Sequence, residues 1–221
     1  MQAETTRCHT KGHPEFTILS DDHVTSEVGV PWLIAWLEDR VIAGEVFREG
    51  ESVQVGWMYD LIIARPDGTL GIQEPDFQRV PVAWVESVTQ TLRHIWYQKE
   101  VAASVALAPD FPSYRQTAIV CTRLRDSPVL FMHRDESSDP DSGWFIGCYD
   151  DGHDHQDAAQ LVSVSLFEAA VSWDQRFIGY AALPAGCYVV AGQGGPPVIT
   201  MEDKPLDLVP GSLLSSWGVS S

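Results

Sequence analysis

Apolar residues recur at helical spacing near the start of the chain and give one apolar face, made of Leu33, Ile34, Leu37, Val41 and Ile42. Pro31 and Gly44 bracket this pattern: proline loses no hydrogen bond in a first turn, and glycine is common just after a helix. We therefore expect a helix from near Pro31 to near Gly44, with its apolar face on a core.

A second and longer helical pattern covers residues 81–107. Its apolar stripe runs from Trp84 to Trp96, and Pro81 is placed to begin the helix. His94 falls among polar neighbours on this helix, so we expect it to face solvent rather than to act as a base in a cleft.

Between these two patterns, β-branched and aromatic residues dominate residues 51–65, which favours a strand. The sequence PDGT at 66–69 predicts a turn, and residues 70–77 can return as an antiparallel partner. The pattern predicts an α-β-β-α unit over residues 24–107, preceded by a tail at residues 1–23.

The second half of the chain alternates short apolar runs with turns, which is typical of strands. The runs that predict strands are residues 117–124, 128–134, 142–149 and 185–192. Residues 163–173 predict a short helix that Ser163 or Ser165 caps, and Glu168 follows Ser165 at the spacing of a capping box.

Residues 108–116 carry two prolines and no periodicity, so we place a linker there. Residues 117–221 then form a small mixed β-sheet domain with a short helix. Together with the unit before the linker, they predict an α+β fold in two parts.

The net charge of this chain limits which classes of molecule it can bind. Thirty-one Asp and Glu residues against fourteen Lys and Arg give the 221 residues a formal net charge of −17. Nucleic acid and anionic membranes are repelled by such a surface, whereas a basic protein is attracted. The sequence also lacks an apolar run long enough for a signal peptide or a spanning helix, so we expect a cytoplasmic protein.

The cysteines stand singly along the chain, without a CxxC pair. This spacing fits reduced thiols better than a disulfide framework or a zinc clamp. Cys121, Cys148 and Cys187 each have apolar neighbours, so we expect them to be small core residues.

Residues 133–157 form an acidic segment that suits a metal site, a catalytic carboxylate pair or a docking surface. Its carboxylates are Asp135, Glu136, Asp139, Asp141, Asp150, Asp151, Asp154 and Asp157. His153 and His155 add candidate ligands for zinc or calcium. A calcium loop requires glycine where Trp144 stands, and HxH alone is a weak signal, so we favour a solvated acidic segment without metal or cofactor.

Enzymatic motifs are absent from the sequence: it contains no GxSxG, HExxH or GxxxxGK[ST]. His133 flanks the acidic segment and is interpreted as a surface histidine. The sequence therefore assigns no catalytic residue and predicts a protein that is not an enzyme.

Large aromatic residues stand among the acidic ones, as they do in protein interfaces. Alternation along a strand puts Trp144 and Ile146 on one face and Phe145 and Gly147 on the other, so only one pair is free to contact a partner. We assign Trp144 to the core and keep Tyr149 as a possible anchor.

Three stretches, DSGWFIGCYDD, LVSVSLFEAAVSW and LPAGCYVV, resemble a family of bacterial immunity proteins from polymorphic-toxin and type VI secretion systems. The resemblance spans Ala118 to Val190, with SGW as its most specific piece, and the first half of the chain is similar to the N-terminal companion region of larger members. The stretch QLVSVSLFEAA departs from the family's usual loop. The resemblance implies an antidote that binds a cognate toxin, and it carries over no catalytic residue.

Charge and resemblance together lead us to expect an immunity protein that neutralises a basic toxin, with a nuclease as the favoured kind because nucleases present a positive surface to phosphates. The predicted contact residues are Asp135, Glu136, Asp139, Asp141, Tyr149, Asp150, Asp151, Asp154 and Asp157. Two alternatives remain open: a small metal-dependent hydrolase that uses the His and Asp cluster, and an adaptor that escorts an effector.

Overall fold

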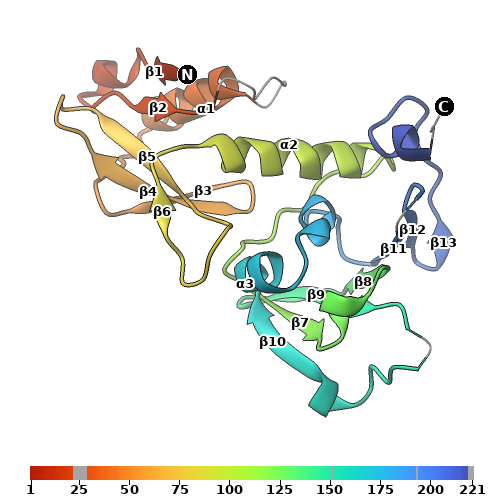
Figure 1. Ribbon diagram of the computed structural model, residues 1–221. Coiled ribbons are helices and arrows are strands. Elements are labelled where there is room, and N and C mark those ends of the chain that lie inside the picture. Colours follow the sequence, from red (N-terminus) through yellow and green to blue (C-terminus); the bar gives the residue numbers. More distant parts are fainter. Residues whose placement is uncertain (22–28, 151, 193, 219–221) are drawn as a thin grey trace. The chain divides into compact units, whose positions relative to one another are not determined.

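A computed structural model describes residues 1–21, 29–150, 152–192 and 194–218 (Figure 1). The chain divides into two compact units, Met1–Asp76 with Pro81–Trp96 and Phe77–Val80 with Tyr97–Ser221. The division falls within helix α2 (Thr89–Ala103). Each unit combines helix and strand, which confirms the α+β class, while the linker at 108–116 stays a prediction.

The first unit contains a two-stranded and a four-stranded antiparallel sheet with helix α1 between them in the chain. Its elements are β1 (Gln2–Glu4), a 3₁₀ helix (Cys8–Lys11), β2 (Thr17–Leu19), α1 (Val30–Ile42), β3 (Ser52–Val55), β4 (Met58–Ala64), β5 (Leu70–Pro75) and β6 (Trp84–Val85). The larger sheet keeps chain order, β3-β4-β5-β6, as expected of successive hairpins.

Helix α1 is confirmed, as are its predicted limits. Pro31 stands in its first turn, and Gly44, with φ of 102°, follows its end. Leu33, Leu37 and Val41 are almost completely buried and form the face that packs into the core. The other two residues of the predicted stripe lie at its margin, where Ile34 is partly buried and Ile42 is exposed.

The single strand predicted for residues 51–65 is wrong, because the segment folds back on itself as β3 and β4. Gly56 adopts a φ of 62°, and Val55 pairs directly with Met58 across a two-residue turn. Glycine reaches this conformation at no steric cost, so it reverses the chain inside a run of strand-forming residues. The predicted 66–69 turn and the antiparallel return as β5 are confirmed.

The second predicted helix begins eight residues later than Pro81, at Thr89. Trp84 and Val85 are drawn instead into β6, where they pair with β5, and both are exposed. Pairing with a neighbouring strand thus overrides the helical periodicity of these two residues.

The prediction that His94 faces solvent is also wrong. Its side chain is buried in the first unit, and Trp57 Nε1 donates a hydrogen bond to His94 Nδ1 at 3.2 Å. Burial lowers the pKa of His94 to about 3, so this imidazole is neutral at physiological pH.

Two buried carboxylates lie beside the start of α2. Glu74 accepts hydrogen bonds from the backbone N–H groups of Gln90 and Thr91, at 3.1 and 2.7 Å, and so caps the helix. Asp60 is fully buried nearby and accepts a hydrogen bond from Thr91 Oγ1 at 3.1 Å. Burial and the charge of Glu74 raise the pKa of Asp60 well above its usual range.

Substitution of Asp60 by asparagine is expected to make stability less sensitive to a rise in pH above about 4. A carboxyl with a raised folded-state pKa is stabilising below the unfolded pKa of about 4, and that contribution is lost as pH rises toward the folded value. Between about pH 5 and pH 8, urea denaturation should show Asp60→Asn gaining about 1–3 kcal/mol relative to wild type.

Asp67→Asn is the matched control, because hydrogen bonds from Thr69 lower the pKa of exposed Asp67. A lowered carboxyl pKa changes stability only as pH falls below the unfolded value of about 4, so the difference between Asp67→Asn and wild type should stay constant between about pH 5 and pH 8. A pH-independent difference between Asp60→Asn and wild type would contradict the neutral state of Asp60.

The second unit is built on a seven-stranded sheet. Its elements are β7 (Thr117–Cys121), β8 (Leu130–Arg134), β9 (Asp141–Cys148), β10 (Leu161–Ser165), α3 (Leu166–Glu168), a π-helical turn (Ala169–Trp173), a 3₁₀ helix (Gln175–Tyr180), β11 (Cys187–Ala191), β12 (Val198–Met201) and β13 (Lys204–Pro205), with shorter 3₁₀ turns at Leu124–Asp126, Ala158–Gln160 and Leu214–Gly218. The strand order is β10-β7-β9-β8-β11-β12-β13. All neighbours are antiparallel except β7 and β9, which run parallel.

The four predicted strands of the second half are confirmed as β7, β8, β9 and β11. The predicted 163–173 helix is correct only from Leu166 onward, because residues 161–165 pair with β7 as β10. Ser165 caps the helix as predicted, with its Oγ accepting the Glu168 N–H at 3.1 Å. In the part of the chain that the structure describes, no helix has the length and apolarity needed to cross a membrane.

Candidate functional site

The two faces of the seven-stranded sheet differ in character. Trp144 and Ile146 of β9 are buried on the inner face, as predicted, and Trp144 Nε1 donates to the carbonyl of Ala181 at 3.0 Å. Phe145 lies on the opposite face and is only partly buried. The outer face is therefore the side of this sheet on which aromatic rings are accessible to a partner.

Four rings from three adjacent strands gather on the outer face: Phe131 and His133 from β8, Phe145 from β9 and Tyr188 from β11. His133 is stacked between Phe145 and Tyr188, with centroid distances of 5.2 Å on both sides. Phe131 packs at a tilt against Phe145, at 6.1 Å. We call the depression that these four rings line the aromatic groove.

The expected surface histidine, His133, is thus half-buried at the centre of the groove. Its side chain is 25 % exposed, and its Nε2 lies 3.5 Å from Asp135 Oδ2. Its Nδ1 is buried without a hydrogen-bond partner among the described residues. This nitrogen offers an unused polar group inside an aromatic surface.

Three of the predicted contact residues also line the aromatic groove: Asp135, Glu136 and Asp141. Asp135 and Glu136 are exposed in the turn after β8, and Asp141 begins β9. Asp141 Oδ1 is already engaged by the Gly143 N–H at 3.0 Å, whereas the Asp135 side chain is 73 % exposed. The groove therefore has an acidic rim on one side.

The other predicted residues that the structure describes do not line the groove, and several of them accept hydrogen bonds from nearby groups. Asp139 accepts from Gln116 Nε2 at 2.6 Å, Asp154 from the Gln156 N–H at 2.8 Å and Asp157 from the Ala159 N–H at 3.0 Å. Asp151 lies outside the described residues.

Tyr149 and Asp150 line a second depression, together with Cys148 and Arg123. Tyr149 is 61 % exposed, as suits an anchor. Asp150 forms an ion pair with Arg123 at 3.2 Å, and the Gly152 N–H and Arg123 lower the pKa of its carboxyl.

The SGW sequence makes a tight junction at the start of β9. Buried Ser142 donates its hydroxyl to the Thr117 carbonyl at 2.7 Å, opposite an irregularity in the β7–β9 register. Gly143 has a φ of 78°, and a Cβ there would collide with the carbonyl oxygen of Asp135. Serine, glycine and tryptophan therefore each meet a separate steric or hydrogen-bonding demand.

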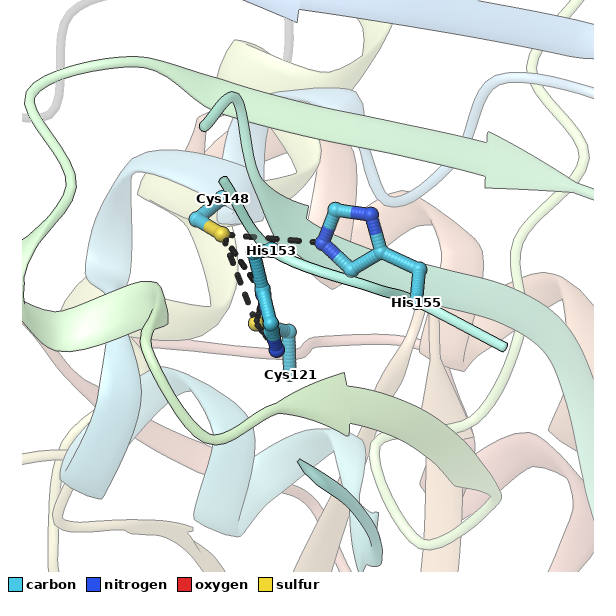
Figure 2. A group of neighbouring side chains, drawn as sticks. All are labelled: Cys121, Cys148, His153 and His155. Carbon is cyan, nitrogen blue, oxygen red and sulfur yellow. Dashed lines mark hydrogen bonds between the residues drawn. The ribbon is translucent and has the colours of Figure 1, made fainter. Parts of the chain in front are cut away.

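Sequence reasoning named His153 and His155 as candidate metal ligands but missed that two cysteines join them in a cluster, at the C-terminal ends of two central strands of the same sheet (Figure 2). Cys121 ends β7 and Cys148 ends β9, and the two strands run parallel, so their ends lie side by side. The loop after β9 brings His153 and His155 back to these cysteines. Cys121, Cys148 and Cys187 are all buried, as predicted, and of these three Cys187 lies outside the cluster.

The cluster is compact and mostly buried. The two Sγ atoms are 3.5 Å apart, His153 Nδ1 is 3.0 Å from each, and His155 Nε2 is 3.5 Å from Cys148 Sγ. Burial and the neighbouring Cys121 raise the pKa of Cys148 to about 11, while burial and His153 lower the pKa of His155.

Residues 97–200 match the family model of the Imm33-like domain. This part of the chain is similar to the Imm33-like domain. The Imm33-like domain contains the SGW junction, the aromatic groove and the Cys/His cluster, and it encloses the segment Ala118–Val190 that carries the sequence resemblance. The predicted immunity-protein family is thereby confirmed.

An Imm33-like domain indicates an immunity protein in general, which implies a cognate toxin as its partner. Residues 1–96 lie outside the match. Searches of the curated proteins and of the solved structures returned no match to this chain.

Proposed function

We propose that this chain is an immunity protein that binds a secreted antibacterial toxin in the cytoplasm and silences it by stoichiometric association. The favoured toxin is a nuclease delivered by type VI or contact-dependent secretion. The Imm33-like domain supports the general role, and the net charge of −17 supports a basic partner.

The observation that carries this proposal is the aromatic groove with its acidic rim. Tightly bound protein interfaces combine a desolvated aromatic centre with a polar rim, and a few aromatic residues supply most of their binding energy. Tyr188 is 38 % exposed and Phe145 half-buried, so both rings can be covered further by a partner. Asp135 and Glu136 stand beside them to pair with Arg or Lys.

The remaining acidic residues contribute mainly to capture. Exposed ion pairs are worth little individually, and salt screens them beyond about 8 Å. Their summed field nevertheless raises association rates, toward about 10⁸ M⁻¹s⁻¹ in favourable cases. An immunity protein benefits from this speed because it must bind incoming toxin before damage accumulates.

Protection of cells tests the function directly. The wild-type chain should rescue a cell that expresses, in its own cytoplasm, the toxin encoded beside it. An adaptor that only escorts an effector would not rescue this cell, and a hydrolase would act below a one-to-one ratio. Co-purification from the native cell, followed by mass spectrometry, identifies the toxin for measurements in solution.

Two variants test separately how the acidic rim affects the association rate of the toxin and how the aromatic groove affects its dissociation rate. Asp135→Lys with Glu136→Lys is expected to slow association about 10-fold at low salt, because it reverses the charge of the rim. Tyr188→Ala is expected to speed dissociation at least about 10-fold, as loss of an interface anchor does. Surface plasmon resonance with purified toxin resolves both rates.

Glu202→Lys with Asp207→Lys is the control of matched charge, since neither residue lines the aromatic groove. It should change association less than the rim variant does. Equal effects of the two double variants, together with an unchanged dissociation rate for Tyr188→Ala, would exclude the groove as the binding surface.

A further inference from the structure

We propose that Cys121, Cys148, His153 and His155 form a tetrahedral site for a structural Zn²⁺ ion, which fixes the acidic loop 149–160 to the ends of β7 and β9. This inference does not depend on the proposed function. Each residue offers one ligand atom, and the four atoms lie within 4.8 Å of one another. Two thiolates and two imidazoles are a ligand set typical of structural zinc.

Four of the six distances between ligand atoms lie within about 0.5 Å of the edges of a zinc tetrahedron. With Zn–S of about 2.3 Å and Zn–N of about 2.0 Å, those edges measure roughly 3.3–3.8 Å. The observed separations are 3.5 Å between the sulfurs, 3.0 Å from His153 Nδ1 to each sulfur, and 3.5 Å from His155 Nε2 to Cys148 Sγ. All four ligand atoms lie within 4.8 Å of one another, so shifts of up to about 1 Å place an ion among them.

The backbone is arranged to stabilise negative sulfur at both cysteines. The Arg123 N–H donates to Cys121 Sγ at 3.3 Å, and the Asp150 N–H donates to Cys148 Sγ. In both cases the donor is two residues after the cysteine. Hydrogen bonds of this kind orient metal-binding thiolates and compensate their charge.

Turn chemistry brings the histidines to the sulfurs. The Asp150 side chain accepts the Gly152 N–H at 3.0 Å and the Asp150 carbonyl accepts the His153 N–H at 3.1 Å, which closes a turn over the end of β9. Gly147 leaves room for His155, since a Cβ there would lie 3.2 Å from His155 Nε2 and 2.7 Å from the Phe145 ring.

The charge balance also favours a divalent cation. Binding of Zn²⁺ to two thiols and two neutral imidazoles releases two protons to solvent and leaves a neutral site, with no change in oxidation state. Asp150, Asp154 and Asp157 act electrostatically on the imidazoles of the cluster and add negative potential around it. Four protein ligands fill a zinc tetrahedron, so the site is closed to substrate and structural in kind.

Metal content of the full chain tests the site. The protein is purified without a polyhistidine tag under reducing conditions, and its zinc is measured by inductively coupled plasma mass spectrometry. One zinc per chain is expected. Replacement by Co²⁺ should give the intense visible bands of tetrahedral cobalt and a thiolate-to-cobalt charge-transfer band, which water or carboxylate ligands do not give.

Cysteine variants locate the ion. Cys121→Ala with Cys148→Ala should lose the zinc and the charge-transfer band, whereas Cys8→Ala, which removes another buried cysteine, should keep both. His155→Ala covers the case in which the double cysteine variant does not fold, because His155 is the most exposed ligand. It should weaken Co²⁺ binding at least about 10-fold while the circular dichroism spectrum is unchanged.

Removal of the ion from wild type gives a readout of the loop itself. Chelation should speed protease cleavage within residues 149–160 by about 10-fold or more, and added Zn²⁺ should reverse the effect. Chelation of the Cys121→Ala, Cys148→Ala variant should change nothing.

Three results would each overturn the proposal. The first is a wild-type protein with well under one zinc per chain that binds Co²⁺ without a charge-transfer band, as expected if thiols and imidazoles only share hydrogen bonds. The second is zinc content that persists in the double cysteine variant. The third is a Cys121–Cys148 disulfide in protein kept reduced, shown by its mass and by unreactive thiols.

Discussion

Replacement of Arg134 by methionine is expected to lower the free energy of unfolding by about 3–5 kcal/mol. Arg134 is the last residue of β8, and its side chain is 8 % exposed. Its Nε donates to the Ser142 carbonyl at 3.1 Å, and its Nη1 donates to the carbonyls of Asp110 and Leu183, both at 2.7 Å. Methionine fills similar space but leaves these carbonyls without donors, so their desolvation is no longer compensated.

The guanidinium of Arg134 also pairs with the Asp110 carboxylate at 3.3 Å. Lysine can keep this charge but not all three carbonyl contacts, because it lacks the planar fork of donors, so Arg134→Lys should fall between wild type and methionine. Arg125→Met is the matched control, since Arg125 is exposed against the Trp173 ring, and it should cost about 1 kcal/mol or less. Urea denaturation of the full chain measures all three. Equal losses for Arg134→Met and Arg125→Met would show that the buried contacts add nothing.

Substitution of Gly143 by alanine is expected to cost about 2–4 kcal/mol, because it combines two penalties. The φ of 78° is unfavourable for any residue with a Cβ, and that Cβ would collide with the Asp135 carbonyl oxygen. The same carbonyl belongs to the turn that carries the acidic rim, so relief of the collision should also shift Asp135.

Gly186→Ala separates the two penalties. Gly186 has a φ of 88°, and an added Cβ would have no heavy atom within 4 Å. This variant should lose only the conformational part, about 1–2 kcal/mol. If Gly143→Ala lowers the free energy of unfolding no more than Gly186→Ala does, the turn at Asp135 moves away from the added Cβ at no measurable cost.

Local patterns were sufficient where the determinants of structure lie within a few residues. The spacing of Leu33, Leu37 and Val41 defines helix α1, and Ser165 caps α3 through its own third neighbour. Strand alternation also separated Trp144 from Phe145 correctly, so the sequence distinguished the buried face of β9 from the face that lines the groove.

Predictions failed where a distant segment competes for a residue. Trp84 and Val85 fit a helical stripe, but β5 offers them backbone partners, so they form β6 instead. His94 has polar neighbours in sequence, yet α2 turns it toward Trp57, which no local window contains.

The Cys/His cluster was hidden for the same reason. Cys121 and Cys148 are 27 residues apart, and only the parallel pairing of β7 with β9 brings them together. Part of the signal was nonetheless present, because Cys148, His153 and His155 follow one another within eight residues. Closely spaced histidines after a cysteine-ended strand justify a search for a distant second cysteine.

The place of β9 between β7 and β8 sets the order in which this sheet can assemble. β7 leaves the ribosome before β8 and β9, yet its neighbours in the sheet are β9 and β10, both of which come later in the chain. The β8–β9 hairpin is local and can form first. β7 can pair only after β9 has been synthesised, and the two strands then pair in parallel. A nascent chain halted before residue 141 therefore exposes an unpaired, apolar β7, and its risk of aggregation ends when β9 is made.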